Sequence, residues 1–303
     1  MTKIYSHTRP AAVDIVDAFC ALQKGFTDQF VYYDKVRACR YMGLGRCIAL
    51  PTLDDMEYDL EGASGTAAPN SERRDAAGAV AGAAGTAGGA SCASGAGTAS
   101  GNAAAAPAVS PGSALDPALQ PPVFFSFNRF DAENPAPTDE LFEAFPRLKF
   151  MLPEIVLIEN ERGTLLQVNS LGPVYAGRME RFIRQALAAP PRRRAAIPYR
   201  LEPDSRDAWR AAVGTGLDAI GEGRVDKVVL SRRQKLVADH PFSSKDLLVN
   251  LIDGPARGTV LLYRYADVFF CGCTPELLVR KRGDHLESMC LAGTCPAGAS
   301  PEE

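Results

Sequence analysis

Lys227 is the first residue whose type and surroundings could support catalysis. It lies in the run Val225–Arg233, flanked by Val228, Val229 and Leu230, and a strand here would put Lys227 on one face with Val229. Burial lowers the pKa of an ammonium group and leaves a neutral amine that can act as a base. The alternative, which the pattern alone favours, is a lysine that protects an edge strand from aggregation.

Two further segments carry candidate groups. Glu276 follows Thr274-Pro275 directly after the strand-like run Cys271–Cys273, and loops at strand ends often hold functional groups. Leu291–Thr294 is a small-residue turn that could present backbone N–H groups to an anion. Considered alone, Glu276 is better interpreted as an ordinary solvated glutamate, and Leu291–Thr294 as a plain tight turn.

Other site chemistries find little support. The histidines His7, His240 and His285 are far apart, and without a Gly-x-Ser-x-Gly motif they indicate no serine triad. Gly221-x-Gly223 is not a dinucleotide-binding fingerprint, because it ends a predicted helix and follows no strand. No phosphate-binding loop motif is present either. The cysteines are interpreted as reduced thiols. Four of them could hold zinc, although small buried residues on adjacent strands are favoured: Cys271, Cys273, Cys290 and Cys295.

Taken in order, the motifs Lys227–Arg232, Cys271–Val279 and Leu291–Thr294 resemble those of the chorismate-utilising enzymes. That family includes isochorismate synthase, salicylate synthase, anthranilate synthase component I and aminodeoxychorismate synthase. The spacing also fits, since Glu276 lies 49 residues after Lys227 and Gly293 lies 17 residues after Glu276. The three motifs together are much more specific than any one of them.

The resemblance indicates the branch that adds water to chorismate. In that branch a lysine at the position of Lys227 serves as general base, where anthranilate synthases usually have glutamine. Aminodeoxychorismate synthases carry a nucleophilic lysine where this chain has Ala292. Isochorismate synthase is therefore the favoured activity. The alternative is salicylate synthase, which goes on to eliminate pyruvate.

The resemblance also implies roles for the site residues. Neutral Lys227 would activate a water that attacks C2 of chorismate, and protonated Glu276 would donate a proton to the departing C4 hydroxyl. Two groups with opposed protonation states need opposed pKa shifts. Backbone groups near Ala292, Gly293 and Thr294 would contact the substrate, and Mg²⁺ would be held by glutamates.

The chain departs from the family after its last motif. The magnesium glutamates and a substrate-binding arginine are expected beyond Glu303, so no metal ligand is expected in this chain. Cys295–Gly298 stands where the family usually has an arginine-glycine step. These departures predict a fragment that is inactive by itself, with exposed sheet edges. The alternative from another class is a non-catalytic binding or interaction protein built from a truncated fold.

The resemblance implies chorismate as the partner, and composition argues against nucleic acid and a membrane. The net charge of −3 excludes nucleic-acid binding through bulk positive charge. No apolar run approaches the ~18 residues of a membrane span. Asp14 and Asp17 interrupt the stretch that a signal peptide needs. We expect a cytoplasmic protein, or a plastid one in a photosynthetic eukaryote, that is monomeric when full length.

The elements that must position these residues predict an α+β fold with largely antiparallel sheets. Four divisions are expected: 1–60 and 123–201 as two parts of a variable subdomain, 61–122 as a disordered Ala/Gly-rich insertion, and 202–303 as the first half of a catalytic domain. Helices are predicted from Pro10 to Leu22, around Tyr175–Ala186, from a cap at Asp204 or Ser205 to Ile220, and over Ser244–Ile252. The arginines Arg192–Arg194 are interpreted as a solvated connector, with a phosphate site as the weaker alternative.

Strands are predicted on both sides of the insertion. Asn160–Gly163 and Gly283-Asp284 read as hairpin turns. The predicted strands are Phe30–Tyr33, Val36–Leu50 with breaks at Gly43 and Gly45, Val123–Phe127, Ile155–Ile158, Thr164–Val168, Val225–Arg233, Thr259–Arg264, Val268–Cys273, Leu277–Arg282 and His285–Cys290.

Overall fold

The fold is taken from a computed structural model, which describes most of the chain outside the Ala/Gly-rich region. The described residues are 2–37, 39–50, 56–61, 81–82, 120–127, 140–145, 150–161, 163–173, 176–203 and 205–291. The predicted disordered insertion at 61–122 therefore lies almost wholly outside them, as do Ala292, Gly293 and Thr294.

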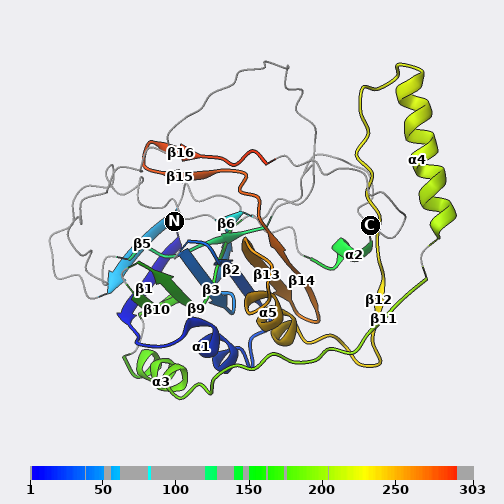
Figure 1. Cartoon of the computed structure of the whole chain (residues 1–303). Coiled ribbons are helices and arrows are strands. Elements are labelled where there is room, and N and C mark those ends of the chain that lie inside the picture. Colours follow the sequence, from blue (N-terminus) through cyan, green and yellow to red (C-terminus); the bar gives the residue numbers. More distant parts are fainter. Residues whose placement is uncertain are drawn as a thin grey trace, which may run out of the picture.

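An eight-stranded sheet forms the centre of the molecule (Figure 1). Its order is β14-β13-β2-β3-β9-β10-β1-β5, and only the outermost pair, β1 with β5, is parallel. The predicted α+β class with largely antiparallel sheets is thus confirmed. The strands are β1 (Thr2–Pro10), β2 (Gln29–Asp34), β3 (Cys39–Leu44), β5 (Met56–Glu61), β9 (Ile155–Asn160), β10 (Gly163–Ser170), β13 (Thr259–Tyr265) and β14 (Val268–Thr274).

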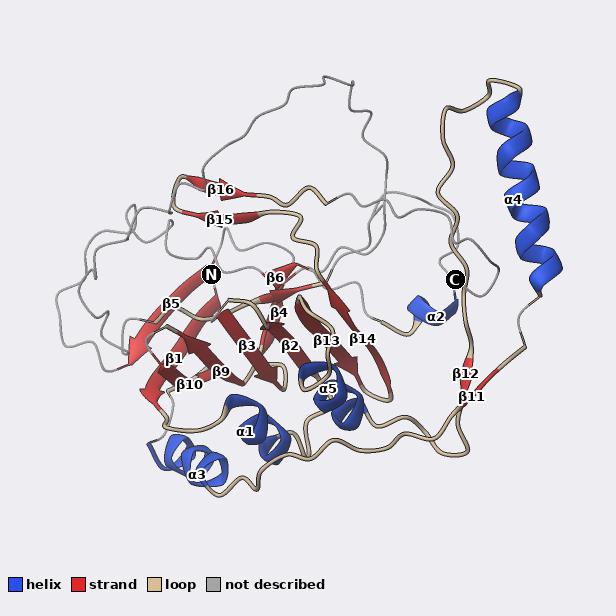
Figure 2. Ribbon diagram, viewed as in Figure 1, coloured by secondary structure: helices blue, strands red, loops and turns tan. Residues whose placement is uncertain are grey.

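Three helices cover one face of this sheet (Figure 2). They are α1 (Ile15–Leu22), α3 (Ala176–Leu187) and α5 (Ser244–Ile252). Asp14 caps α1 by accepting the backbone N–H groups of Val16 and Asp17, and Ser243 caps α5 in the same way. The helix predicted to open at Pro10 therefore begins later. Pro10 instead ends β1, a strand that the sequence analysis missed.

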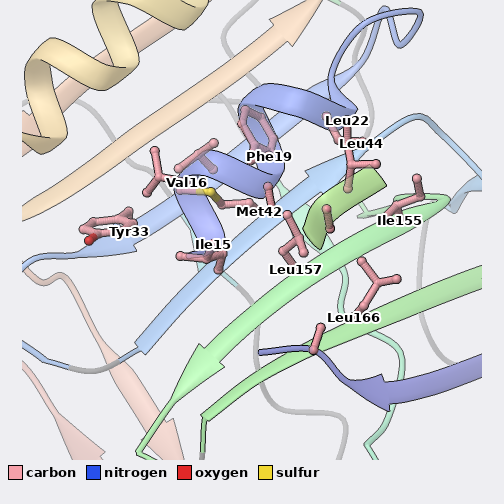
Figure 3. Close-up of a cluster of buried hydrophobic side chains, with 14 of the residues drawn as sticks. Ile15, Val16, Phe19, Leu22, Tyr33, Met42, Leu44, Ile155, Leu157 and Leu166 are labelled. Atoms are coloured by element: carbon pink, nitrogen blue, oxygen red, sulfur yellow. The ribbon is translucent and has the colours of Figure 1, made fainter. Parts of the chain in front are cut away.

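The main hydrophobic core lies between these helices and the sheet. Ile15, Val16 and Phe19 of α1 point onto the sheet strands (Figure 3). Because side chains alternate along a strand, Ile155 and Leu157 face the helices while Val156 and Ile158 face the other side. Both faces of the central strands are therefore buried.

A four-stranded sheet packs on the second face. It consists of β4 (Ile48–Leu50), β8 (Phe150–Leu152), β7 (Phe125–Ser126) and β6 (Ala81–Gly82). Phe125 stacks on Phe30 of β2 with ring centroids 5.4 Å apart, and Phe30 stacks in turn on Tyr263 of β13. Gly43, predicted as a strand break, lies inside β3, where a Cβ would approach Pro153 Cγ to 2.4 Å. Glycine is needed there for close packing.

Two parts of the chain lie outside the body, which consists of the two sheets and the helices α1, α3 and α5. The arm, defined as residues 200–203 and 205–237, contains β11 (Arg200–Leu201), α4 (Arg206–Gly221) and β12 (Leu236–Val237), and it extends away from the sheet in Figure 1. The hairpin of β15 (Arg280–Arg282) and β16 (His285–Glu287) lies beyond the ends of the sheet strands. A short helix, α2 (Glu140–Glu143), completes the described elements.

The prediction of a strand at Val225–Arg233 is wrong. All nine residues are exposed and form no strand, because no described strand lies alongside to share ladder hydrogen bonds. The division expected at residue 202 stays a prediction, although the eight-stranded sheet runs across it through the pairing of β13 with β2. Among the described ranges, no helix has the length and apolar character to span a bilayer.

Candidate functional site

Glu276 lies in the loop after β14, and a local hydrogen bond shapes that loop. The backbone N–H of Glu276 donates to Thr274 Oγ1 at 3.2 Å. Gly258, directly before β13, has φ +123°, and a Cβ there would lie 2.2 Å from the carbonyl oxygen of Thr274. Only glycine allows the two backbone segments to come this close, so Gly258 determines where the loop after β14 leaves the sheet.

Glu276 lines a small cavity of about 120 Å³ at this end of the sheet. Glu276 is exposed to solvent at the rim of this cavity. The other lining residues come from β2 and the turn after it, from the start of β13, from the loop after β14 and from the segment after β16: Tyr32, Asp34, Val36, Arg37, Gly258, Thr259, Pro275, Leu277 and Met289.

A buried ion pair attaches the hairpin to β2 beside this cavity. Arg280 Nη2 donates to Asp34 Oδ2 at 3.3 Å and to Tyr32 Oη at 3.4 Å. Burial opposes the charge on Arg280, but the hydrogen bond and proximity of Tyr32, together with Asp34, raise its pKa. Asp34 also accepts the backbone N–H groups of Val36 and Arg37, each at 2.9 Å. Asp34 therefore holds both the turn and the hairpin in place.

Lys227 occupies a different environment from the one the sequence predicts. It is exposed on the segment 222–235 that returns from α4 to β12, with the apolar side chains of Val228 and Val229 exposed beside it. Val228 lies beside α4, where a Cβ added at Gly216 would be 3.6 Å from its side chain, but Val228 itself stays 41% exposed. The structure therefore shows no burial that would desolvate the Lys227 amine.

The structure does not bring Lys227 and Glu276 together. Glu276 lies at the edge of the sheet, whereas Lys227 belongs to the arm, which extends away from that sheet (Figure 2). The third predicted component, Ala292, Gly293 and Thr294, lies outside the described residues. The roles assigned to all five residues remain proposals.

Arg192 forms an ionic cluster that the sequence analysis missed. Its guanidinium donates to Asp14 at 2.8 Å, to Asp17 at 3.1 Å and to both oxygens of Asp253 at 3.1–3.2 Å. Its backbone N–H also donates to Asp17. The side chain is only 19% exposed, so Arg192 is not the solvated connector predicted for Arg192–Arg194. It joins the N-terminus of α1 and the C-terminus of α5 to the chain that leads into the arm.

The described residues do not fit a Mg²⁺ site. Within the described ranges, no three His, Cys, Asp or Glu side chains gather closely enough to hold a metal ion. The three aspartates that converge do so on Arg192, which already supplies their counter-charge. Of the cysteines considered for zinc, Cys271 and Cys273 are half-buried on β14 and pack against the main core. Cys290 is exposed, contrary to the favoured interpretation, and Cys295 lies outside the described residues.

The chain matches known proteins over the region that carries the candidate residues. The family model described as "Chorismate binding enzyme" matches residues 102–303, a range that includes both Lys227 and Glu276. The isochorismate synthase MenF of Bacillus subtilis is 33% identical over 98 residues, which are 32% of this chain and 21% of that protein. Anthranilate synthase component 1 of Thermus thermophilus is 32% identical over 166 residues, or 52% of this chain and 35% of that protein.

A solved structure supports the same relationship at the level of fold. MenF of Escherichia coli, the menaquinone-specific isochorismate synthase, superposes with a TM-score of 0.53 at 15% identity, covering 93% of this chain and 52% of that one. The chain thus spans about half of that structure and smaller shares of the two relatives above. The model match extends over well more than half of the chain, and the chain belongs to the family of chorismate binding enzymes.

Proposed function

We propose that the protein is an isochorismate synthase, which converts chorismate to isochorismate with Lys227 and Glu276 as its catalytic residues. The observation that carries the proposal is the pair of residue types within the family match: a lysine at 227 and a glutamate at 276. The relatives include isochorismate synthases and anthranilate synthases, so the family alone leaves the reaction open.

The residue at position 227 favours the addition of water over the addition of ammonia. The resemblance assigns a lysine here to the water-adding branch, where anthranilate synthases usually have glutamine. An amine can take a proton from water, whereas a neutral amide cannot act as a base at physiological pH. Ala292 in turn argues against the aminodeoxychorismate synthases, which carry a nucleophilic lysine there.

In the proposed reaction one water molecule adds to chorismate and one water molecule leaves. Lys227 takes a proton from a water as its oxygen bonds to C2 of chorismate, and the ring double bonds shift. Glu276 donates a proton to the C4 hydroxyl, which leaves as water. Lys227 must therefore start neutral and Glu276 protonated. Mg²⁺ is expected from the family, but no step is assigned to it, because the described residues hold no site for it.

The positions of the two residues add a requirement. Lys227 is exposed on the arm, so the reaction requires its amine to be covered and brought to the cavity that holds Glu276. The resemblance places further substrate and metal ligands after Leu291–Thr294. We therefore propose that this chain does not turn over by itself.

Product analysis tests the proposal. Chorismate and Mg²⁺ are incubated with this chain alone, and with a hybrid in which the C-terminal part of the Escherichia coli isochorismate synthase follows Glu303. The hybrid is expected to form isochorismate and the chain alone none. Because general acid–base groups contribute roughly 10²–10⁴-fold to rates, Lys227→Ala and Glu276→Gln should each slow the hybrid by at least about 100-fold while chorismate still binds.

Matched substitutions serve as controls on exposed residues outside the site. Lys245→Ala and Glu222→Gln remove the same chemical groups elsewhere and should leave the rate within about twofold. Near wild-type rates in Lys227→Ala or Glu276→Gln would refute the assigned roles. Salicylate with pyruvate would identify a salicylate synthase instead. A stable, monodisperse hybrid without turnover would favour the non-catalytic binding protein.

A further inference from the structure

A second cavity, much larger than the one beside Glu276, lies between three hairpin ends. Its volume is about 500 Å³, within the ~300–1,000 Å³ range of small-molecule sites. The turn from β2 to β3 contributes Val36, Arg37 and Cys39, and the turn from β9 to β10 contributes Glu161. The hairpin of β15 and β16 contributes Arg280, Arg282, His285 and Glu287.

One complete face of the hairpin lines this cavity. Arg280 pairs with Glu287 across the ladder, and Arg282 pairs with His285. Because side chains alternate along each strand, these four residues share one face, whereas Lys281 and Leu286 share the other. The charged face is thus set by the fold and is not a chance gathering of surface side chains.

Two carboxylates line the cavity, Glu161 and Glu287, and Glu287 is paired with arginines. Glu287 accepts from Arg37 and lies 3.8 Å from Arg280, which also binds Asp34. Two basic side chains, Arg282 and His285, lie opposite each other at the turn end of the hairpin, on either side of Gly283-Asp284. Within the described ranges, neither donates a hydrogen bond to any protein group.

Arg282 and His285 are placed so that one anion can reach both side chains. They lie directly opposite each other on neighbouring strands, where Cβ atoms are about 5 Å apart. A guanidinium offers two parallel N–H donors to a carboxylate or phosphate, and the imidazole adds another donor. Arg37, which is 39% exposed, can supply a third contact from the opposite wall.

We infer that this cavity binds a small dianion, a dicarboxylate or inorganic phosphate, through Arg282, His285 and Arg37. The cavity shares Val36 and Arg37 with the smaller one that holds Glu276. The bound anion would therefore lie beside the candidate catalytic loop, where it can act as an effector. This site does not depend on the proposed reaction, because binding is measured directly.

Calorimetric titration of the chain at constant ionic strength tests the inference. Malonate and phosphate should bind saturably and at least about tenfold more tightly than acetate, which offers a single carboxylate. Arg282→Gln and His285→Gln should each weaken malonate binding by about fivefold or more, since each removes a charge-assisted hydrogen bond. Lys281→Gln is the matched control: it removes a positive charge from the same strand but from its other face.

The control decides between a built site and general surface charge. The inference holds if Lys281→Gln changes the malonate affinity by less than about twofold. It is overturned if neither malonate nor phosphate binds saturably, or if Lys281→Gln weakens binding as much as Arg282→Gln does.

Discussion

The body of the molecule and its arm carry similar apolar sequence patterns, but these side chains are buried in the body and exposed in the arm. In the body, apolar side chains are buried on both faces of the central strands. In the arm, α4 is also amphipathic and is capped by Ser205, yet Ala219 is its one buried residue. Local signals are enough to form a helix, whereas burial requires a neighbour.

The same contrast separates two strand-like runs. Thr259–Tyr265 and Val225–Arg233 both carry β-branched and aliphatic residues in sequence. The first lies between β2 and β14 and becomes β13, while the second has no described neighbour and stays unpaired. Strand formation therefore depends on pairing that no local pattern contains.

The largest expected difference concerns leucine truncation. Leu157→Ala in the body, where the side chain is fully buried, should destabilise the protein by about 2–5 kcal/mol because it leaves a cavity. Leu217→Ala in the arm, where the side chain is 64% exposed, should change stability by no more than about 0.5 kcal/mol. Urea unfolding monitored by circular dichroism measures both. Equal losses would mean that the arm is packed in solution.

The Arg192 cluster should show the next largest effect. Arg192→Gln leaves Asp14, Asp17 and Asp253 without their shared counter-charge, and we expect a loss of about 1–3 kcal/mol. The control is Arg193→Gln, since Arg193 is an exposed neighbour, and its effect should stay within about 0.5 kcal/mol. Similar unfolding midpoints for the two variants would show that the cluster adds no stability.

The same cluster predicts a dependence on acid pH. Burial opposes ionisation of Asp14, but hydrogen bonds from the Asp17 backbone, the Arg192 side chain and the Val16 backbone outweigh it and lower the pKa below 3.8. A depressed carboxyl pKa stabilises the fold above the unfolded-state value, and this stability is lost as the pH falls through the folded-state pKa. Between about pH 5 and pH 3, the Asp14→Asn variant should therefore lose less stability than the wild type, as measured by thermal unfolding. If the unfolding temperatures of both proteins fell in parallel with pH, Asp14 would not be the group responsible.

Cysteine reactivity should differ between the body and the hairpin, and this is the smallest of the expected effects. Burial raises the pKa of Cys20 and of Cys47 to about 11, so few of these thiols are ionised at pH 8. Cys290, next to the hairpin, is exposed. Iodoacetamide followed by peptide mass spectrometry should label Cys290 well before Cys20 and Cys47. Simultaneous labelling would indicate that the body opens as readily as the hairpin.

The sequence predicts best those elements whose signals and partners are both close in the chain. The helix Ser244–Ile252 and the hairpin turns at Gly163 and Gly283-Asp284 are confirmed, because capping and turn residues act over a few positions. The Arg192 cluster escaped prediction since it joins residues up to 178 positions apart. Lys227 was expected on a paired strand, and only the three-dimensional arrangement shows that no described strand adjoins it.

The central claim is that residues from the arm and the body act on one substrate, adding water at C2 of chorismate. The most direct test runs the hybrid protein in ¹⁸O-labelled water and locates the label by mass spectrometry. Isochorismate should carry one ¹⁸O in its C2 hydroxyl, and Lys227→Ala should form this labelled product at least about 100-fold more slowly. Isochorismate formed without label would contradict the claim, because the attacking oxygen could not then have come from water.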